Sequence, residues 1–194
     1  MPSLVYKTPL LVPIPTTFDE YLKRATKKCR YEQKNATRID YHEVEFDKDE
    51  VAYWMELWER QPIKGGFPRW RKYTPDKFAA LYEQKILHVF SCGRGLQMVE
   101  KYDEYIYAHP PLYEKTDPIA KSMWFGLIEW CCGKIEWLDL GGGAQKRWNQ
   151  LERLGYKWLY VPKDIELMPW KVQVCECGWR QLVEGNSRCR SCRR

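Results

Sequence analysis

The sequence contains no apolar run of the roughly 18 residues that a membrane crossing takes. Its first stretch, MPSLVYKTPLLVPIP, lacks a basic start and is interrupted by prolines, unlike a secretory signal. Internal repeats and low-complexity segments are also absent, which excludes solenoid and linker-like architectures. We therefore expect a globular protein of the cytoplasm that has no membrane partner.

The chain has 194 residues, enough for one well-buried domain and a small appendage but too few for two full domains. Its 44% hydrophobic and 30% charged residues are typical of a globular protein. Ten Trp, thirteen Tyr and six Phe are many for this length. We expect some of these rings to line a groove, because aromatic faces stack on planar ligands and bases.

Positive charge is concentrated in two places, although the net charge is only +6. Residues 171–194 hold six basic and two acidic side chains, and residues 23–38 hold seven basic and one acidic. Clusters of this kind favour a polyanionic partner such as nucleic acid. For the run at 23–38, a solvated helix face is the alternative.

Four of the eight cysteines fall close together in CECGWRQLVEGNSRCRSC. They form a Cys-x-Cys pair and a Cys-x-x-Cys pair separated by eleven residues: Cys175, Cys177, Cys189 and Cys192. Two close pairs joined by a hairpin-sized loop can hold one zinc ion between four thiolates. Such a zinc is structural, because no position is left for water. Two disulfides are the alternative, and they require an oxidising compartment.

The predicted zinc ribbon occupies residues 171–194 and follows a larger domain at 1–170. Its surface is rich in arginine, which favours nucleic acid, although many ribbons bind protein instead. The candidate contacts in the ribbon are Arg180, Arg188 and Arg190. A second candidate surface interleaves cations with aromatic rings: Arg69, Trp70, Arg71 and Lys72. That pattern suits base stacking and phosphate contact, with an ordinary basic loop as the alternative.

Hydrophobic periodicity predicts helices and strands in mixed order. The expected helices lie at 18–33, 47–61, 74–85 and 118–132, and a loop followed by a helix is expected at 141–155. Asp47 and Asp117 are expected to cap two of them, and Pro75 and Pro118 to occupy first turns. The expected strands are 39–46, two or three within 85–109, then 135–140 and 156–162. The order is that of an α+β domain with a mixed sheet.

The segment EWLDLGGGAQKRW matches the cofactor loop of a methyltransferase, because a strand ends in Asp139 before three glycines. A doubly wound sheet, however, needs several further strand–helix units of roughly 30 residues each. The chain has little room for them on either side of the glycines. A methyltransferase dependent on S-adenosylmethionine is therefore kept as a third possibility.

A longer stretch, AKSMWFGLIEWCCGKIEWLDLGGGAQKRWNQLERLGYKWLYVP, places a helix before a strand that ends in Asp-x-Gly-Gly, with Tyr156-Lys157 further on. This order resembles the second half of the GNAT-like fold in Fem-type aminoacyltransferases. The chain departs from that family in having one such domain, no helical arm, and no clear acetyl-CoA loop. It is also similar to Mom-type DNA-modification proteins of phages, which would place it in the host cytoplasm.

The resemblance implies a GNAT-like mixed β-sheet flanked by helices, with the zinc ribbon appended. It further implies an enzyme that transfers an acyl or aminoacyl group to an amine, on DNA more than on RNA. The donor would be an acyl-CoA or an aminoacyl compound. The alternative from another class is a zinc-ribbon protein that binds nucleic acid without turnover.

Several residues are candidates for this chemistry. Asp139 can accept a proton or hold the amine, and Lys157 can stabilise an oxyanion by its charge. Contacts with the acyl donor are predicted for glycines that expose backbone N–H groups and for a cation between two glycines. These residues are Gly141, Gly142, Gly143 and Arg94. The alternatives are a helix cap at Asp139, a tight turn at the glycines, and ordinary loop or surface placement for Arg94 and Lys157.

Three further side chains are candidate catalytic residues. His42 lies in a predicted strand beside Tyr41 and Glu43, and His109 opens the proline loop HPPLY. Ser122 lies in the first turn of a Trp-rich helix and is a candidate for binding donor or acceptor. For each of the three, a purely structural placement is the alternative.

Overall fold

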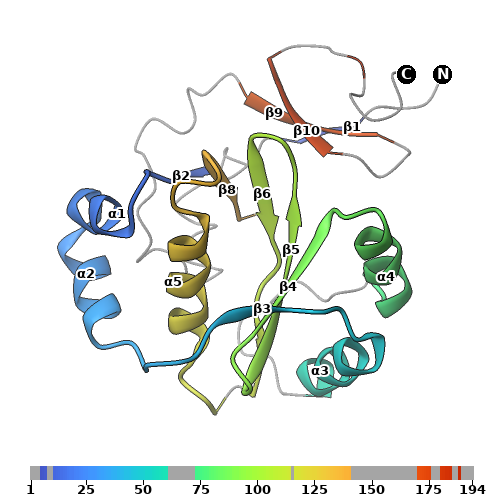
Figure 1. Ribbon diagram of the computed structural model, residues 1–194, viewed down its shortest axis with the longest axis horizontal. Helices are drawn as coiled ribbons and strands as arrows, with labels where there is room; N and C mark the ends of the chain where they lie inside the picture. The colour runs from blue at the N-terminus through green and yellow to red at the C-terminus, as the bar shows by residue number, and fades with distance from the viewer. Residues whose placement is uncertain are drawn as a thin grey trace.

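The computed structural model describes residues 5–7, 11–60, 73–114, 116–140, 170–175, 180–184 and 188. Within these residues the chain forms a seven-stranded mixed sheet flanked by helices, and a separate three-stranded sheet (Figure 1). The predicted α+β class with a mixed sheet is confirmed.

The large sheet has the strand order β2-β8-β6-β5-β4-β3, and β7 also pairs with β5. Neighbouring strands are antiparallel except β6 and β8, which run parallel. The strands are β2 (Leu11–Pro13), β3 (His42–Val44), β4 (Leu87–Ser91), β5 (Gly95–Lys101), β6 (Tyr105–Ala108), β7 (Leu112–Tyr113) and β8 (Trp137–Asp139). Two or three strands were expected within 85–109, and the structure has three, β4, β5 and β6; the strand expected at 39–46 is shorter.

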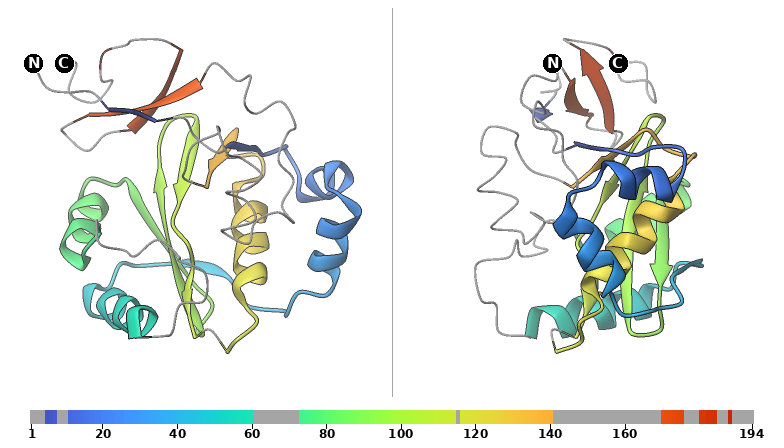
Figure 2. Two further views of the ribbon diagram at one scale, coloured as in Figure 1. Left: turned by 180° about the vertical axis from the view of Figure 1, so that it is seen from behind. Right: turned by 90° about the vertical axis from the view of Figure 1, so that its left-hand side faces the viewer.

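Helices cover both faces of this sheet. Figures 1 and 2 show α1 (Phe18–Arg24), α2 (Lys27–Lys34) and α5 (Ala120–Cys131) on one face. The other face carries α3 (Lys48–Arg60) and α4 (Pro75–Glu83). The first group of helices is called the α5 side below, and the second group the α4 side.

Side-chain caps explain where most helices begin. Asp47 Oδ1 accepts the backbone N–H groups of Asp49 and Glu50, which confirms the predicted cap of α3. The helix expected at 18–33 is instead two helices, because Thr26 leaves helical geometry and its Oγ1 accepts the N–H of Cys29 at 3.1 Å. A second N-cap therefore divides one periodic segment.

The start of α5 differs from the prediction. Its N-cap is Ile119, which makes no side-chain cap hydrogen bond. Asp117 is not the cap, because its carboxylate faces Arg94, with 3.4 Å between Oδ2 and the Arg94 Nε. The ion pair ties the β4–β5 turn to the segment before α5.

A β-bulge interrupts the pairing of β5. Val99 lies opposite Ala108, whereas Leu96 lies opposite Leu112, so residues 97–98 face the longer segment 109–111. This segment is His-Pro-Pro, and prolines have no N–H to donate to a ladder. The strand therefore bends here, and bulges of this kind are common beside active sites.

The small sheet has the order β1-β9-β10 and is antiparallel throughout. Its strands are β1 (Val5–Lys7), β9 (Trp170–Val174) and β10 (Arg180–Glu184). It therefore combines strands from both ends of the sequence, although the sequence analysis assigns no strand to the proline-rich N-terminal stretch. The β9–β10 hairpin contains the first part of the predicted zinc ribbon.

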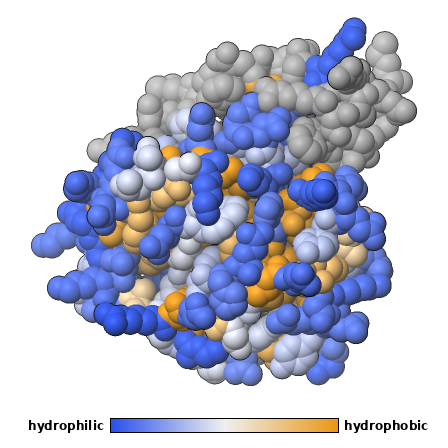
Figure 3. All heavy atoms as spheres, in the orientation of Figure 1, coloured by the Kyte–Doolittle hydropathy of each residue, from blue (hydrophilic) through white to orange (hydrophobic). Residues whose placement is uncertain are grey.

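Most aromatic side chains of the described residues pack in the core. Among the described residues, the large hydrophobic side chains exposed to solvent are Tyr31, Tyr53 and Tyr82. The face drawn in Figure 3 is largely hydrophilic, with small hydrophobic areas between the polar groups. Within the described ranges, no helix has both the length and the hydropathy for a membrane crossing.

Candidate functional site

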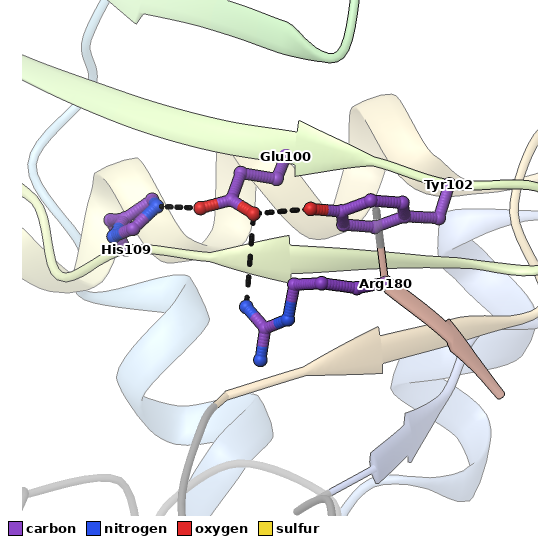
Figure 4. A network of polar contacts seen from close by, with 4 residues as sticks. All are labelled: Glu100, Tyr102, His109 and Arg180. Atoms are coloured by element: carbon purple, nitrogen blue, oxygen red, sulfur yellow. Dashed lines mark hydrogen bonds and ion pairs between the residues drawn. The ribbon is translucent and has the colours of Figure 1, made fainter. Parts of the chain in front are cut away.

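A buried carboxylate, Glu100, organises the junction between the two sheets (Figure 4). It lies near the end of β5, and its residue is 3% exposed. One oxygen, Oε1, lies 2.9 Å from Nε2 of His109. The other, Oε2, accepts a hydrogen bond from the Tyr102 hydroxyl and lies 3.7 Å from Nη1 of Arg180. Three elements of the fold thus meet at one acid.

Arg180 comes from the small sheet and reaches into this junction. Its Cζ lies 3.9 Å from the centroid of the Tyr107 ring, a cation–π geometry. Only 8% of the residue is exposed. The predicted contact with nucleic acid requires a cation on the surface, and Arg180 is buried instead. The physical reason is the acid of β5, far away in sequence, which compensates the buried guanidinium.

The ionisation states follow from burial and from these partners. Burial alone would raise the pKa of Glu100, but the hydrogen bond from His109 and the charge of Arg180 hold it at about 2. Burial also opposes the charge of Arg180, yet Glu100 and Asp139 keep its pKa above the usual value. The site therefore holds an ionised carboxylate and an ionised guanidinium at neutral pH.

His109 lies on the bulge, where only 1% of the residue is exposed. Burial lowers its pKa in spite of the Glu100 partner, so the ring is neutral and its Nε2–H donates to Oε1. Its ring meets the rings of Tyr73, Phe78 and Tyr107 edge-on. His109 is thus a packed hydrogen-bond donor in this network.

Asp139 ends β8 and is 1% exposed. The register places it beside Tyr107 of β6 and Leu11 of β2. Directly paired residues share one face of a sheet, so Asp139, Tyr107 and Glu100 project to the same side. Burial is the largest influence on both neighbouring groups: it raises the pKa of Tyr107 and lowers the pKa of Arg180. The charge of Asp139 raises both pKa values.

Two buried polar atoms of this region have no hydrogen-bond partner in the described part of the chain. They are Nε of Arg180 and the hydroxyl of Tyr105. Burial raises the pKa of Tyr105 far above its ordinary value, so the hydroxyl keeps its proton. Both groups are N–H or O–H donors beside the strand that carries Asp139, and they can bind an oxygen atom of a ligand.

Two predicted catalytic residues lie apart from this junction. His42 is on the edge strand β3, four strand positions from β8, or about 19 Å at about 4.8 Å per strand. Its exposed ring is 3.5 Å from Oδ1 of Asp40. Ser122 is buried on α5, on the opposite side of the sheet from Glu100. The structure therefore brings His109 and Asp139 to one side of the sheet, whereas Ser122 is on the other side and His42 is at the far edge of the sheet.

The remaining residues predicted to contact a donor or nucleic acid lie in different parts of the chain. Arg94 is half-exposed in the β4–β5 turn and pairs with Asp117. Arg188 is exposed, and its carbonyl accepts a hydrogen bond from Gln181 at 2.8 Å. Predicted residues outside the described ranges are Gly141, Gly142, Gly143, Lys157, Arg69, Trp70, Arg71, Lys72 and Arg190.

The predicted zinc site also lies mostly outside the described ranges. Cys175 follows β9 directly and is buried, whereas Cys177, Cys189 and Cys192 are not among the described residues. No cluster of three or more potential metal ligands occurs in the part of the chain that is described. The zinc ligands therefore remain a prediction from the cysteine spacing.

Sequence reasoning missed Glu100, Tyr102 and Tyr107. One signal was present: the strand GLQMVEK carries a single acid at its apolar end, before the exposed Lys101. A carboxylate buried in a strand requires a compensating partner, which turned out to be Arg180. The identity of that partner depends on how the two sheets meet.

Comparisons with known proteins found no match for this chain. No protein-family model matches it, and no curated protein or solved structure was found to be similar.

The network predicts a specific loss of stability in acid. Because the folded pKa of Glu100 is about 2 against an ordinary 4.5, its contribution is complete above pH 4.5 and is lost as the pH falls towards 2. At 1.36 kcal/mol per pKa unit, this contribution is about 3 kcal/mol. Replacing Tyr102 by Phe removes one hydrogen bond to the ionised carboxylate, and should lower the free energy of unfolding by about 2 kcal/mol at pH 7.

Urea unfolding of wild type and Tyr102→Phe from pH 7 down to about pH 1.5, below the folded pKa of Glu100, measures this effect. The difference between the two proteins should shrink as Glu100 becomes protonated. Tyr31→Phe is the matched control, because Tyr31 is 66% exposed, and it should unfold like wild type throughout. A Tyr102→Phe difference that does not vary with pH would contradict an ionised Glu100.

Proposed function

We propose that this protein transfers an acyl or aminoacyl group to an amine, and that its acceptor is nucleic acid, DNA in particular. The order of the central elements supports a GNAT-like interpretation of the mixed sheet. Three antiparallel strands, β4 to β6, are followed by α5 and then by β8, which returns parallel to β6. This helix and strand carry the sequence resemblance described above.

The observation that carries the proposal is the parallel β6–β8 pair with the bulge beyond it. Ligands of mixed α/β sheets are commonly bound outside the carboxyl ends of parallel strands. Here those ends carry Asp139 on β8 and the bulged His109 after β6. Tyr105, at the other end of β6, and Arg180 carry unpartnered donors, and both lie near enough to Asp139 for its charge to raise their pKa values. The Asp139 carboxylate and two hydrogen-bond donors, from Tyr105 and Arg180, are thus the groups available to a ligand beside β8.

The chemistry assigns different tasks to these groups. The acceptor amine forms a bond to the acyl carbon, the bond from that carbon to the donor's sulfur or ribose oxygen breaks, and the proton lost by the amine leaves on that sulfur or oxygen. Asp139 accepts a hydrogen bond from the amine and so orients it. N–H and O–H donors stabilise the oxyanion as it forms, a part that Lys157 would share.

Exposed cations on the α5 side support a nucleic-acid acceptor. The basic run at 23–38 forms α1, α2 and the segment after them, and most of its charged ends are in solvent. Its exposed cations are Lys23, Arg24, Lys27, Lys28, Arg30, Lys34 and Arg38. Such a surface attracts phosphates without reading sequence. The same surface favours the second candidate function, binding of nucleic acid without turnover.

We further propose a structural zinc in the C-terminal region, held by Cys175, Cys177, Cys189 and Cys192. Cys175 directly follows β9, and Arg180 begins β10, so this hairpin carries both a predicted ligand and the arginine of the buried network. Metal bound there would restrict the hairpin and favour the position of Arg180 against Glu100. Because four thiolates fill its coordination sphere, the zinc would take no part in the reaction.

Base modification can be tested in cells that express the protein together with plasmid DNA. The DNA is digested to nucleosides, and their masses are compared for wild type and Asp139→Asn. We expect a new nucleoside with wild type, whose added mass identifies the transferred group, and at least a hundredfold less with Asp139→Asn, about the effect of losing one key polar contact in a transition state. Asp103→Asn, an exposed acid in the β5–β6 turn, is the control and should act like wild type.

Two results would contradict the enzyme proposal. Unchanged nucleosides in both DNA and tRNA, with a folded protein, would favour the binding function. Equal modification by wild type and folded Asp139→Asn would remove Asp139 from the chemistry. Binding of labelled DNA by the same preparations distinguishes an inactive binder from a protein that has no nucleic-acid partner.

The zinc proposal predicts one zinc per chain in the purified protein. Cys189→Ser should lose most of this metal and unfold at a lower temperature, because metal binding at such a site contributes to folding. Cys92→Ser, which changes a half-buried thiol near the β4–β5 turn, should retain it. Metal analysis and thermal unfolding give both readouts. Equal zinc content in the two variants, or none in wild type, would overturn the site.

A further inference from the structure

A cavity of about 750 Å³ lies on the α5 side of the sheet. It is bounded by α5, by the end of α2, and by the segment 36–41 that leads into β3. The Glu100 network projects from the other side of the sheet, so the cavity is separate from the region assigned to acyl transfer. Its volume is within the range of about 300 to 1,000 Å³ that holds small-molecule ligands.

One wall of the cavity is fixed by Tyr41. Its hydroxyl donates to Oε1 of Gln97 at 3.0 Å, and its ring stacks on Phe90 with 5.2 Å between centroids. The ring lies against Gly126 so closely that a Cβ there would be 2.7 Å from Tyr41 Cδ1. A glycine within a helix costs stability, and here it makes room for this ring. The wall is therefore formed before any ligand arrives.

The α5 wall offers two polar groups that the described residues leave without partners. Ser122 lines the cavity, and its Oγ is buried without a hydrogen bond. Glu129, two turns later on the same helix face, lines the cavity with a carboxylate that makes no ion pair within the described residues. Phe125 and Trp130 line it too and add aromatic rings. A hydroxyl, a carboxylate and flat apolar surfaces thus meet in one space.

The α2 wall adds positive charge. Lys34 and Arg38 line the cavity, are exposed, and make no ion pair in the described ranges. Two other cations on this side of the sheet are neutralised, because Arg24 pairs with Glu20 and Lys121 with Glu32. Two unneutralised cations at the opening of a cavity favour an anionic group such as phosphate.

We propose that this cavity binds a nucleoside phosphate whose base carries an exocyclic amino group. The base lies against the rings of Phe125 and Trp130, since aromatic surfaces stack on bases. Its amino group donates to Glu129, as carboxylates accept from the amino group of cytosine, and Ser122 bonds a ring nitrogen or carbonyl. The phosphate contacts Lys34 and Arg38. The ligand is either a free nucleotide or a base of single-stranded nucleic acid.

Calorimetric titration with defined nucleotides tests the proposal without donor or turnover, so it is independent of the proposed acyl transfer. The probes are AMP, CMP and UMP, adenosine without phosphate, and a short single-stranded oligonucleotide of adenine and cytosine. AMP or CMP should bind at least about fivefold more tightly than UMP, whose base has no exocyclic amino group, an effect of one charged hydrogen bond. Tighter binding of the oligonucleotide than of AMP assigns the site to nucleic acid, and the reverse assigns it to a free nucleotide.

Variants place the binding in the cavity. Ser122→Ala and Glu129→Gln should each weaken the binding of AMP or CMP by about fivefold. Arg38→Ala should weaken AMP by a similar factor and leave adenosine unchanged, because only the phosphate is lost. Arg60→Ala is the control, because this exposed arginine of α3 pairs with Glu56 and does not line the cavity, and it should bind like wild type.

Two outcomes would overturn the proposal. One is the absence of binding by every nucleotide and by the oligonucleotide. The other is equal affinity for AMP, CMP and UMP, or affinities that Ser122→Ala, Glu129→Gln and Arg38→Ala all leave unchanged. A protein that binds AMP through the cavity but modifies no base would retain this inference and lose only the proposed transfer.

Discussion

The buried contact between Arg180 and Glu100 is the interaction on which the arrangement of the two sheets depends. Neither charge is stable alone in the interior, and removing one partner of such a pair typically costs about 3 to 5 kcal/mol. His109, Tyr102 and Tyr107 complete the environment and keep both charges ionised. Because Arg180 belongs to the small sheet, the pair sets how that sheet meets the end of β5.

The His-Pro-Pro bulge connects this network with the two sides of the large sheet. His109 donates to Glu100 on the α4 side, while its backbone carbonyl accepts from Gln97 at 3.1 Å. Gln97 in turn accepts from Tyr41, which forms a wall of the cavity on the α5 side. A chain of hydrogen bonds therefore runs from the ion pair to the cavity. The proposed transfer site and the proposed nucleotide site share this rigid strand segment.

Local signals in the sequence predicted local structure well. Asp47 and Pro75 mark helix starts as expected, because capping and first-turn preferences depend on neighbouring residues alone. The strand β2 was missed because proline argues against a central strand, whereas Pro13 lies on the edge strand of the sheet. Arg180 was misplaced on the surface because its partner is remote in sequence. The sequence correctly predicted that Asp139 ends a strand. It did not predict that this strand, β8, pairs with β6, because that pairing depends on the overall fold.

A double-mutant cycle on Glu100 and Arg180 tests the central claim most directly. The free energy of unfolding is measured at pH 7 for wild type, Glu100→Gln, Arg180→Met and the double variant. If the pair joins the two sheets, each single variant leaves a buried charge, and the two losses should exceed the loss in the double variant by about 2 kcal/mol or more. Additive losses, within about 0.5 kcal/mol, would show that Arg180 and Glu100 do not stabilise each other.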